Sequence, residues 1–224
     1  MRALLFIAAL SATTTRIGSA EPLGITSHTD DSTIAVGARI GGYGFRRESD
    51  PTFTGNWNEC RMNGVGVFAN RTLRGPLFLE AGLDTYFSST DRQAMDLQID
   101  RQSALISTAV GVREHVTSWL DGYIQLGVGV ELTKLSVPYA DGNAIRADKI
   151  LPEGFLGVGG EIHVADKTRI GASIRTLVMG NFNYDPARLD PNNQAWTSTP
   201  TADQVFSATP TLAAQAQFFV ERDL

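Results

Sequence analysis

The sequence contains few of the side chains that bind transition metals or form covalent cross-links: among 224 residues there are 3 histidines and 1 cysteine, Cys60. A single cysteine excludes a disulfide within the chain and a zinc centre built from several thiolates. With so few imidazoles we expect neither a metal centre nor a bound cofactor. We expect Cys60 to be a lone thiol in a loop.

Basic residues are also scarce, because 19 lysines and arginines stand against 24 aspartates and glutamates, which gives a formal net charge of −5. Proteins that bind nucleic acids usually carry a basic patch that matches the phosphate backbone. The charge balance therefore predicts no nucleic-acid partner.

The sequence also lacks a long apolar segment, although a short one stands at the start of the chain. Arg2 is followed by apolar residues 3–10 and then by the small residues 18–20, which is the pattern of a secretory signal peptide. A helix that spans a membrane needs about 20 apolar residues, and no later segment reaches that length. We expect residues 1–20 to be removed and residues 21–224 to form one domain.

The rest of the chain alternates apolar and polar residues, as a β-strand does when its two faces meet different surroundings. In residues 77–87 one face carries leucines, an alanine and Phe87, while the other carries Glu80 and Asp84. The pattern recurs in eight segments, which span residues 33–45, 62–73, 77–87, 102–113, 120–134, 154–164, 168–179 and 211–221. It predicts an all-β fold, an eight-stranded antiparallel up-and-down transmembrane β-barrel with an apolar exterior and a polar lumen.

The connections between these segments alternate in length. The long connections span residues 46–61, 88–101, 135–153 and 180–210, and the short ones span residues 74–76, 114–119 and 165–167. In an outer-membrane barrel the short turns face the periplasm and the long loops face outward. The order therefore predicts a location in the bacterial outer membrane, and loop residues such as Trp57, Tyr139 and Trp196 are candidate contacts for an extracellular ligand.

The charged residues on the polar face are expected to lie inside the barrel. An eight-stranded barrel is just wide enough to be filled by its own side chains, so oppositely charged residues would close the lumen as ion pairs. This lumen ion-pair cluster is predicted to contain Arg39, Glu80, Asp84, Glu131, Glu161, Arg169 and Arg175. Two alternatives stay open: a narrow path for ions or protons along Arg39, Glu80 and Asp84, and a secreted lipocalin-like binding barrel, which would need an apolar interior.

Basic residues on the apolar face occur at strand ends, where the membrane tolerates them near its headgroups. Arg46, Arg61 and Lys134 would lie at the outer leaflet, within reach of lipopolysaccharide phosphates, and ordinary solvation in a loop explains them equally well. Aromatic residues near strand ends predict two interfacial girdles. They are Tyr43, Phe45, Tyr86 and Phe87 on one side and Trp119 and Tyr123 on the other.

The histidines offer one candidate for chemistry. His163 and Glu161 are two residues apart on one strand face, where they could act as an acid–base pair. His115, in a short turn, and His28, near the start of the mature chain, are not expected to join a site with them. One pair alone does not define a catalytic site.

The strand repeats are similar to those of the OmpA/OmpX-type family of eight-stranded outer-membrane β-barrels, in the segments Gly37–Gly41, Val65–Ala69, Gly127–Glu131 and Ala214–Val220. The resemblance extends over residues 21–224 and implies a monomer with a structural or surface-interaction role, surrounded by outer-membrane lipid and lipopolysaccharide. Lipid A deacylases of this kind carry a His-x-Ser pattern, whereas Val164 and Ala165 follow His163 here. No enzymatic activity is therefore expected.

Overall fold

The computed structural model of the protein describes residues 33–46, 59–93, 97–98, 100–138, 144–184 and 206–224. All of them fall in one compact unit, residues 32–224. The segment expected to be a signal peptide, residues 1–20, lies outside the described residues, as do His28, Trp57, Tyr139 and Trp196.

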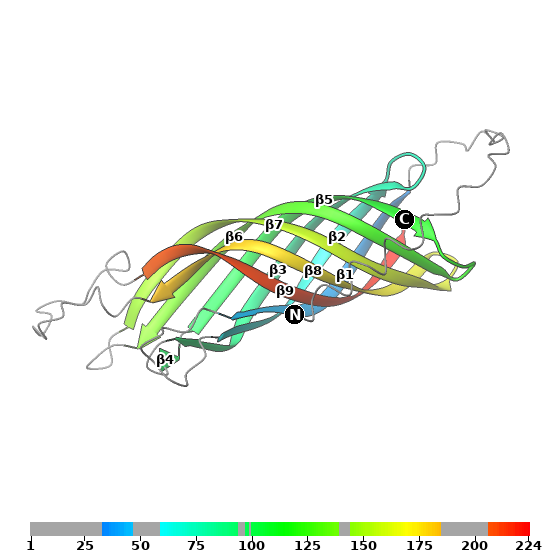
Figure 1. Cartoon of the computed structure of the whole chain (residues 1–224). Helices are drawn as coiled ribbons and strands as arrows, with labels where there is room; N and C mark the ends of the chain where they lie inside the picture. Colours follow the sequence, from blue (N-terminus) through cyan, green and yellow to red (C-terminus); the bar gives the residue numbers. More distant parts are fainter. Residues whose placement is uncertain (1–32, 47–58, 94–96, 99, 139–143, 185–205) are drawn as a thin grey trace, which may run out of the picture. The chain divides into compact units, whose positions relative to one another are not determined.

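The described residues form nine β-strands. They are β1 (Ile34–Arg46), β2 (Glu59–Thr72), β3 (Leu77–Gln93), β4 (Leu97–Gln98), β5 (Asp100–His115), β6 (Leu120–Pro138), β7 (Ala144–Ala165), β8 (Thr168–Tyr184) and β9 (Phe206–Asp223). Neighbouring strands pair antiparallel in the order β2-β1-β9-β8-β7-β6-β5-β3, and pairing of β2 with β3 closes the sheet (Figure 1). The two-residue strand β4 pairs with the end of β3. The predicted eight-stranded antiparallel barrel is thereby confirmed.

One end of the barrel, called the turn end below, holds the short turns at residues 73–76, 116–119 and 166–167. The chain terminus lies there too, because Leu224 N donates a hydrogen bond to Ile34 O at the start of β1. Gly75 has φ of 59° in the first of these turns, a left-handed conformation that glycine adopts without steric penalty. The opposite end is called the loop end.

The strands extend further towards the loop end than the sequence predicts. Residues 135–153, expected to be one long loop, mostly belong to β6 and β7, which stay paired up to Pro138 and Ala144. These strands have 19 and 22 residues, whereas about 9–11 suffice to cross a bilayer. The alternation hid this extension because polar residues such as Arg146 and Asp148 occupy outward positions there. Cys60, expected in a loop, is likewise buried in β2.

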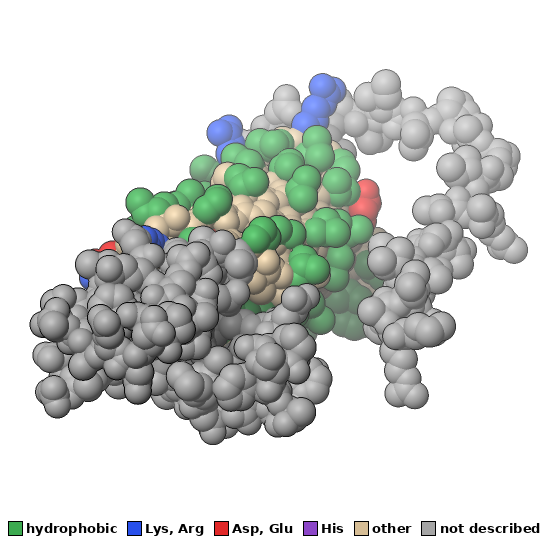
Figure 2. All heavy atoms as spheres, turned by 60° about the vertical axis from the view of Figure 1, so that its left-hand side comes forward, with side chains coloured by type: hydrophobic (Ala, Val, Ile, Leu, Met, Phe, Trp, Pro, Cys, Tyr) green, Lys and Arg blue, Asp and Glu red, His purple; other side chains and the backbone are tan. Residues whose placement is uncertain are grey.

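The exterior of the barrel is apolar. Ile40, Leu126, Ile174 and Phe218, on four different strands, are each 61–64% exposed. On the face shown in Figure 2, hydrophobic side chains cover most of the described surface. Soluble monomers rarely expose apolar patches of more than a few hundred Å², so this surface fits a hydrocarbon environment. Among the described residues no helix is long and apolar enough to cross a membrane.

Most of the aromatic residues assigned to girdles lie inside the barrel instead. Tyr43, Phe45, Tyr86 and Tyr123 are buried, and the rings of Tyr43 and Tyr86 meet edge to face with centroids 5.1 Å apart. Phe87 and Trp119 do face outward, as the girdle prediction requires. The prediction failed for the other four because position along a strand sets depth in the membrane, whereas residue parity sets the face.

Candidate functional site

The polar lumen is the candidate functional site, and its centre is a buried ion-pair layer, here called the middle layer. Arg39 on β1 donates two hydrogen bonds to Asp84 on β3, from Nε at 2.7 Å and from Nη2 at 2.6 Å. Its Nη1 donates to Glu80 at 2.7 Å, and Arg175 on β8 donates to the same Glu80 oxygen at 2.8 Å. All four side chains are buried. Burial of a charge is unfavourable unless a partner compensates it, and here each charge has one.

Glycine at position 66 lets this layer form. Arg39 lies opposite Gly66 in the β1–β2 register, and Gly66 lies opposite Asp84 in the β2–β3 register. A Cβ atom at position 66 would come within 1.8 Å of Asp84 Oδ1. Arg39 therefore reaches a carboxylate two strands away across a position without a side chain. The same guanidinium lies 5.3 Å from the centroid of the Phe68 ring, a favourable cation–π distance.

A second group, the upper layer, lies nearer the loop end. Arg101 on β5 donates to Glu131 on β6 at 2.9 Å, and both side chains are almost fully buried. The hydroxyls of Ser103 and Thr133 also donate to Glu131, and buried Glu153 belongs to the same end of the lumen. The sequence predicts that Arg101 ends a long connection. In the structure it belongs to β5 and lies on the same inward face as Ser103.

A third group, the lower layer, lies at the turn end. Arg113 on β5 pairs with Glu161 on β7 at 2.9 Å. Arg169 on β8 pairs with Glu221 on β9 at 2.7 Å, and it donates to Asp223 at 2.7 Å. Arg169 and Glu221 are direct neighbours in the β8–β9 register. This layer therefore combines two arginines with three carboxylates.

The seven residues predicted as one lumen cluster occupy three separate layers. Arg39, Glu80, Asp84 and Arg175 meet in the middle layer. Glu131 belongs to the upper layer, and Glu161 and Arg169 belong to the lower layer. The predicted set did not contain Arg101, Glu153 and Glu221, which the structure adds to the lumen.

Side chains fill the space between the middle and lower layers. The cavity found there has a volume of about 10 Å³, close to the room that one water molecule needs. Its walls combine charged groups of both layers with the rings of Phe68, Phe78, Tyr123 and Phe219. This packing matches a barrel whose interior is filled by its own side chains.

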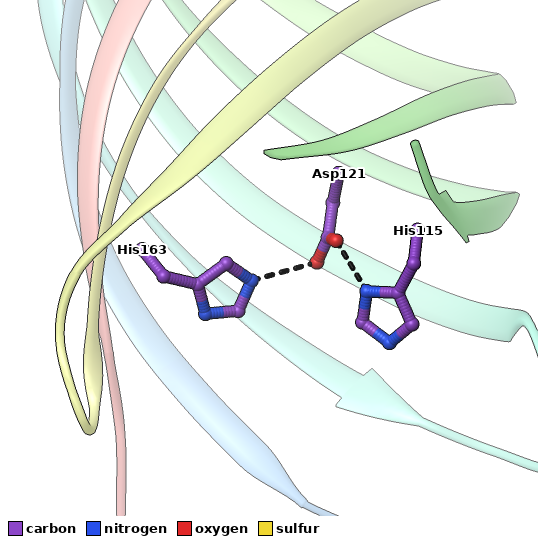
Figure 3. A group of neighbouring side chains, drawn as sticks. All are labelled: His115, Asp121 and His163. Carbon is purple, nitrogen blue, oxygen red and sulfur yellow. Dashed lines mark hydrogen bonds and ion pairs between the residues drawn. The ribbon is translucent and has the colours of Figure 1, made fainter. Parts of the chain in front are cut away.

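The histidines form a different group from the one predicted (Figure 3). His163 Nε2 lies 2.9 Å from Asp121 Oδ2, and His115 Nδ1 contacts the other oxygen of the same carboxylate. The expectation that His115 joins no site with His163 is wrong, because Asp121 links them. The predicted pairing of His163 with Glu161 is not observed, since Glu161 contacts arginines of the lower layer. Asp121 is not among the residues predicted from the sequence, although it shares the inward face of β6 with Tyr123 and Gln125.

The basic residues predicted to face lipopolysaccharide are described in part. Arg61 on β2 and Lys134 on β6 are exposed on the outside of the barrel towards its loop end. Arg46 ends β1 at the same end, and its side chain lies outside the described part of the chain.

The fold has known counterparts. Neisserial surface protein A is 11% identical, with 85% of this chain and 96% of that chain covered and a TM-score of 0.51. A major outer membrane protein from Thermus thermophilus is 12% identical, with 87% of this chain and 100% of that chain covered and a TM-score of 0.56. No protein-family model and no curated protein sequence matches the chain.

Identities this low carry information about the fold alone. The fold shared with these two structures, the apolar exterior and the closed strand order agree with the predicted location in a bacterial outer membrane. The chain is thus an eight-stranded β-barrel of the outer-membrane type.

Proposed function

We propose that the protein is a non-catalytic, monomeric barrel of the bacterial outer membrane, with a lumen closed by ion pairs and a structural or surface-interaction role. The mature domain would comprise residues 21–224, after removal of residues 1–20 as an export signal. The middle layer is the observation that supports this proposal most directly. Arg39 and Arg175 reach Glu80 from two sides of the barrel, and all three side chains are buried.

The lumen groups are engaged with one another, which disfavours catalysis. Within the described strands, the carboxylates of Glu80, Asp84 and Glu131 each bond to an arginine at 2.6–2.9 Å. A general acid or base must reach its substrate within hydrogen-bond distance, and buried, paired groups offer no such access. A lipocalin-like binder is disfavoured too, because its ligand needs an apolar interior.

Surface interaction would take place at the loop end. Strands β6 and β7 are longer than a bilayer requires, so the barrel wall rises beyond the apolar belt there. Connections mounted on such a rigid wall are well placed for recognition.

Fractionation and conductance test this proposal together. The untreated protein should be recovered in the outer membrane and should migrate differently on gels before and after boiling. In planar lipid bilayers it should give no discrete conductance steps, and the exterior variant Arg71→Gln should behave alike. Conductance steps in the native protein would contradict the closed lumen. If their size also changes in Glu80→Gln or Arg39→Gln, the protein is a narrow channel that uses these charges.

Lipopolysaccharide contact is tested separately. Each basic residue near a charged membrane surface contributes about 1 kcal/mol of attraction, so removal of Arg61 and Lys134 together should weaken lipopolysaccharide binding by more than tenfold. Arg71 and Arg222 are exposed as well but lie on the turn-end halves of β2 and β9, and their double glutamine variant is the matched control. Equal loss in both double variants would show that the contact is unspecific.

A further inference from the structure

We propose that His115, Asp121 and His163 bind a divalent transition-metal ion of the zinc or copper type at the turn end of the barrel. Each residue offers one ligand atom, and the three atoms all lie within 4.8 Å of one another. Imidazole nitrogen and carboxylate oxygen are ligands that both ions accept. Its three residues belong to none of the lumen layers, although Arg113 and Arg169 of the lower layer line the same cavity. The ability of the site to bind an ion does not depend on whether the lumen conducts.

Three adjacent strands hold the ligands. His115 ends β5 and lies opposite Asp121 at the start of β6, and Asp121 lies opposite Glu161 on β7, two residues before His163. Figure 3 shows both imidazoles turned towards the carboxylate from its two sides. The paired strands therefore fix the backbone spacing, so only rotations of side chains are needed to present these atoms to one ion.

Two contacts within the group are close to the separation that coordination requires, and one ligand atom from each residue lies within 4.8 Å of the other two. Bonds of about 2.0–2.2 Å in a tetrahedral site place neighbouring ligand atoms roughly 3.4 Å apart. The Asp121–His163 pair is at 2.9 Å and the Asp121–His115 pair is in direct contact. An ion would enter between these atoms and replace the hydrogen bonds, with small rotations of the two rings.

Exposure suits a site that exchanges its ion with solvent. The side chain of Asp121 is 2% exposed, whereas those of His115 and His163 are 82% and 36% exposed. The buried carboxylate is held in place, and the rings are free to adjust. All three residues line an open cavity of about 210 Å³, which leaves room for water as a fourth ligand.

The charge around the site favours a divalent cation. The lumen charges nearest the turn end are two arginines, Arg113 and Arg169, and four carboxylates, those of Asp121, Glu161, Glu221 and Asp223. Both arginines also line the cavity, and they are paired with Glu161, Glu221 and Asp223 rather than with Asp121. A bound divalent ion would neutralise the Asp121 carboxylate, whose ion-pair partners are the two imidazoles.

Calorimetric titration of the folded, untagged full chain in detergent tests the proposal, with Zn²⁺ and Cu²⁺ as probes and Mg²⁺ as a hard-ion comparison. We expect one ion per chain for Zn²⁺ or Cu²⁺ and none for Mg²⁺. Loss of an outer-shell partner alone lowers metal affinity about 10–100-fold, so Asp121→Asn and His163→Ala should each weaken binding at least tenfold.

The control variant is Asp166→Asn, which removes an exposed carboxylate from a turn at the same end and should leave affinity unchanged. Heat-dependent gel mobility establishes that each variant is folded before titration. The proposal is overturned if the native chain binds neither ion. It is also overturned if the double variant His115→Ala/His163→Ala binds as tightly as the native chain, or if Asp166→Asn loses as much affinity as Asp121→Asn.

Discussion

Replacement of Arg39 by glutamine should destabilise the barrel strongly. Arg39 is 4% exposed and bridges two carboxylates. In the variant Glu80 keeps Arg175 as a partner, whereas Asp84 loses both hydrogen bonds that Arg39 donates. Removal of one partner from a buried ion pair costs about 3–5 kcal/mol, because the remaining charge stays buried without compensation. We expect the free energy of unfolding to fall by that amount.

A comparison with Asp84→Asn sharpens the prediction. This change leaves Arg39 paired with Glu80 at 2.7 Å and weakens hydrogen bonds to a charged group, which are worth about 1.5–3 kcal/mol. Arg39→Gln should therefore be the more damaging of the two. The exposed arginine Arg71, on the outside of β2, supplies the control, since surface substitutions usually change stability by less than about 0.5 kcal/mol.

Equilibrium unfolding in urea, in one detergent and with linear extrapolation, measures these differences. A water-filled lumen would screen the charges, and each pair would then contribute about 0–1 kcal/mol. The reasoning is refuted if Arg39→Gln loses less than about 1 kcal/mol or no more than Arg71→Gln. The same experiment thus distinguishes a closed lumen from a solvated one without any measurement of conductance.

Two further substitutions probe the lumen packing and the membrane face. Gly66→Ala should destabilise the protein by about 1.5–3 kcal/mol, because a Cβ atom there meets the Asp84 carboxylate at 1.8 Å. Gly154→Ala is the control and should be neutral in the same unfolding assay, because a Cβ atom there meets no atom within 4 Å. Val128→Arg, at the middle of the apolar face of β6, should cost about 2–4 kcal/mol of stability in lipid bilayers, and Leu132→Arg, nearer the loop end, about 0–1 kcal/mol. Equal losses at the two positions would contradict the inference that Val128 lies deeper in the bilayer than Leu132.

The fold was predictable because a two-residue period is a local property. The residues of each strand indicate by themselves which face is inward and which is outward. The lengths of the connections indicate which strands are neighbours. The strand ends were less predictable. Where β6 and β7 rise beyond the lipid, outward positions carry Arg146 and Asp148, so the apolar face disappears although the pairing continues.

The site was predictable only in part, since parity identifies which residues face the lumen but not which of them meet. Arg39 binds Asp84, a residue two strands away, across Gly66. That contact depends on the registers of two strand pairs together. Asp121 shows the same limit, because it joins His115 and His163 through pairings of β6 with both neighbours, and nothing in its own surroundings in the sequence indicates a histidine partner.

The inward glycines and the inward aromatic residues of the barrel occur as pairs on neighbouring strands. Six lumen-facing glycines lie directly opposite an aromatic residue on a neighbouring strand, and the ring covers each glycine so closely that a Cβ atom would come within 2.5 Å of it. The pairs are Gly37–Phe68, Gly64–Tyr86, Gly111–Phe78, Gly127–Phe155, Gly159–Tyr123 and Gly171–Phe219. A ring laid over a glycine shields backbone that has no side chain of its own. Four of these rings, those of Phe68, Phe78, Tyr123 and Phe219, line the small cavity between the middle and lower layers. Cross-strand pairing of rings with glycines therefore contributes to the filling of the lumen alongside the ion pairs.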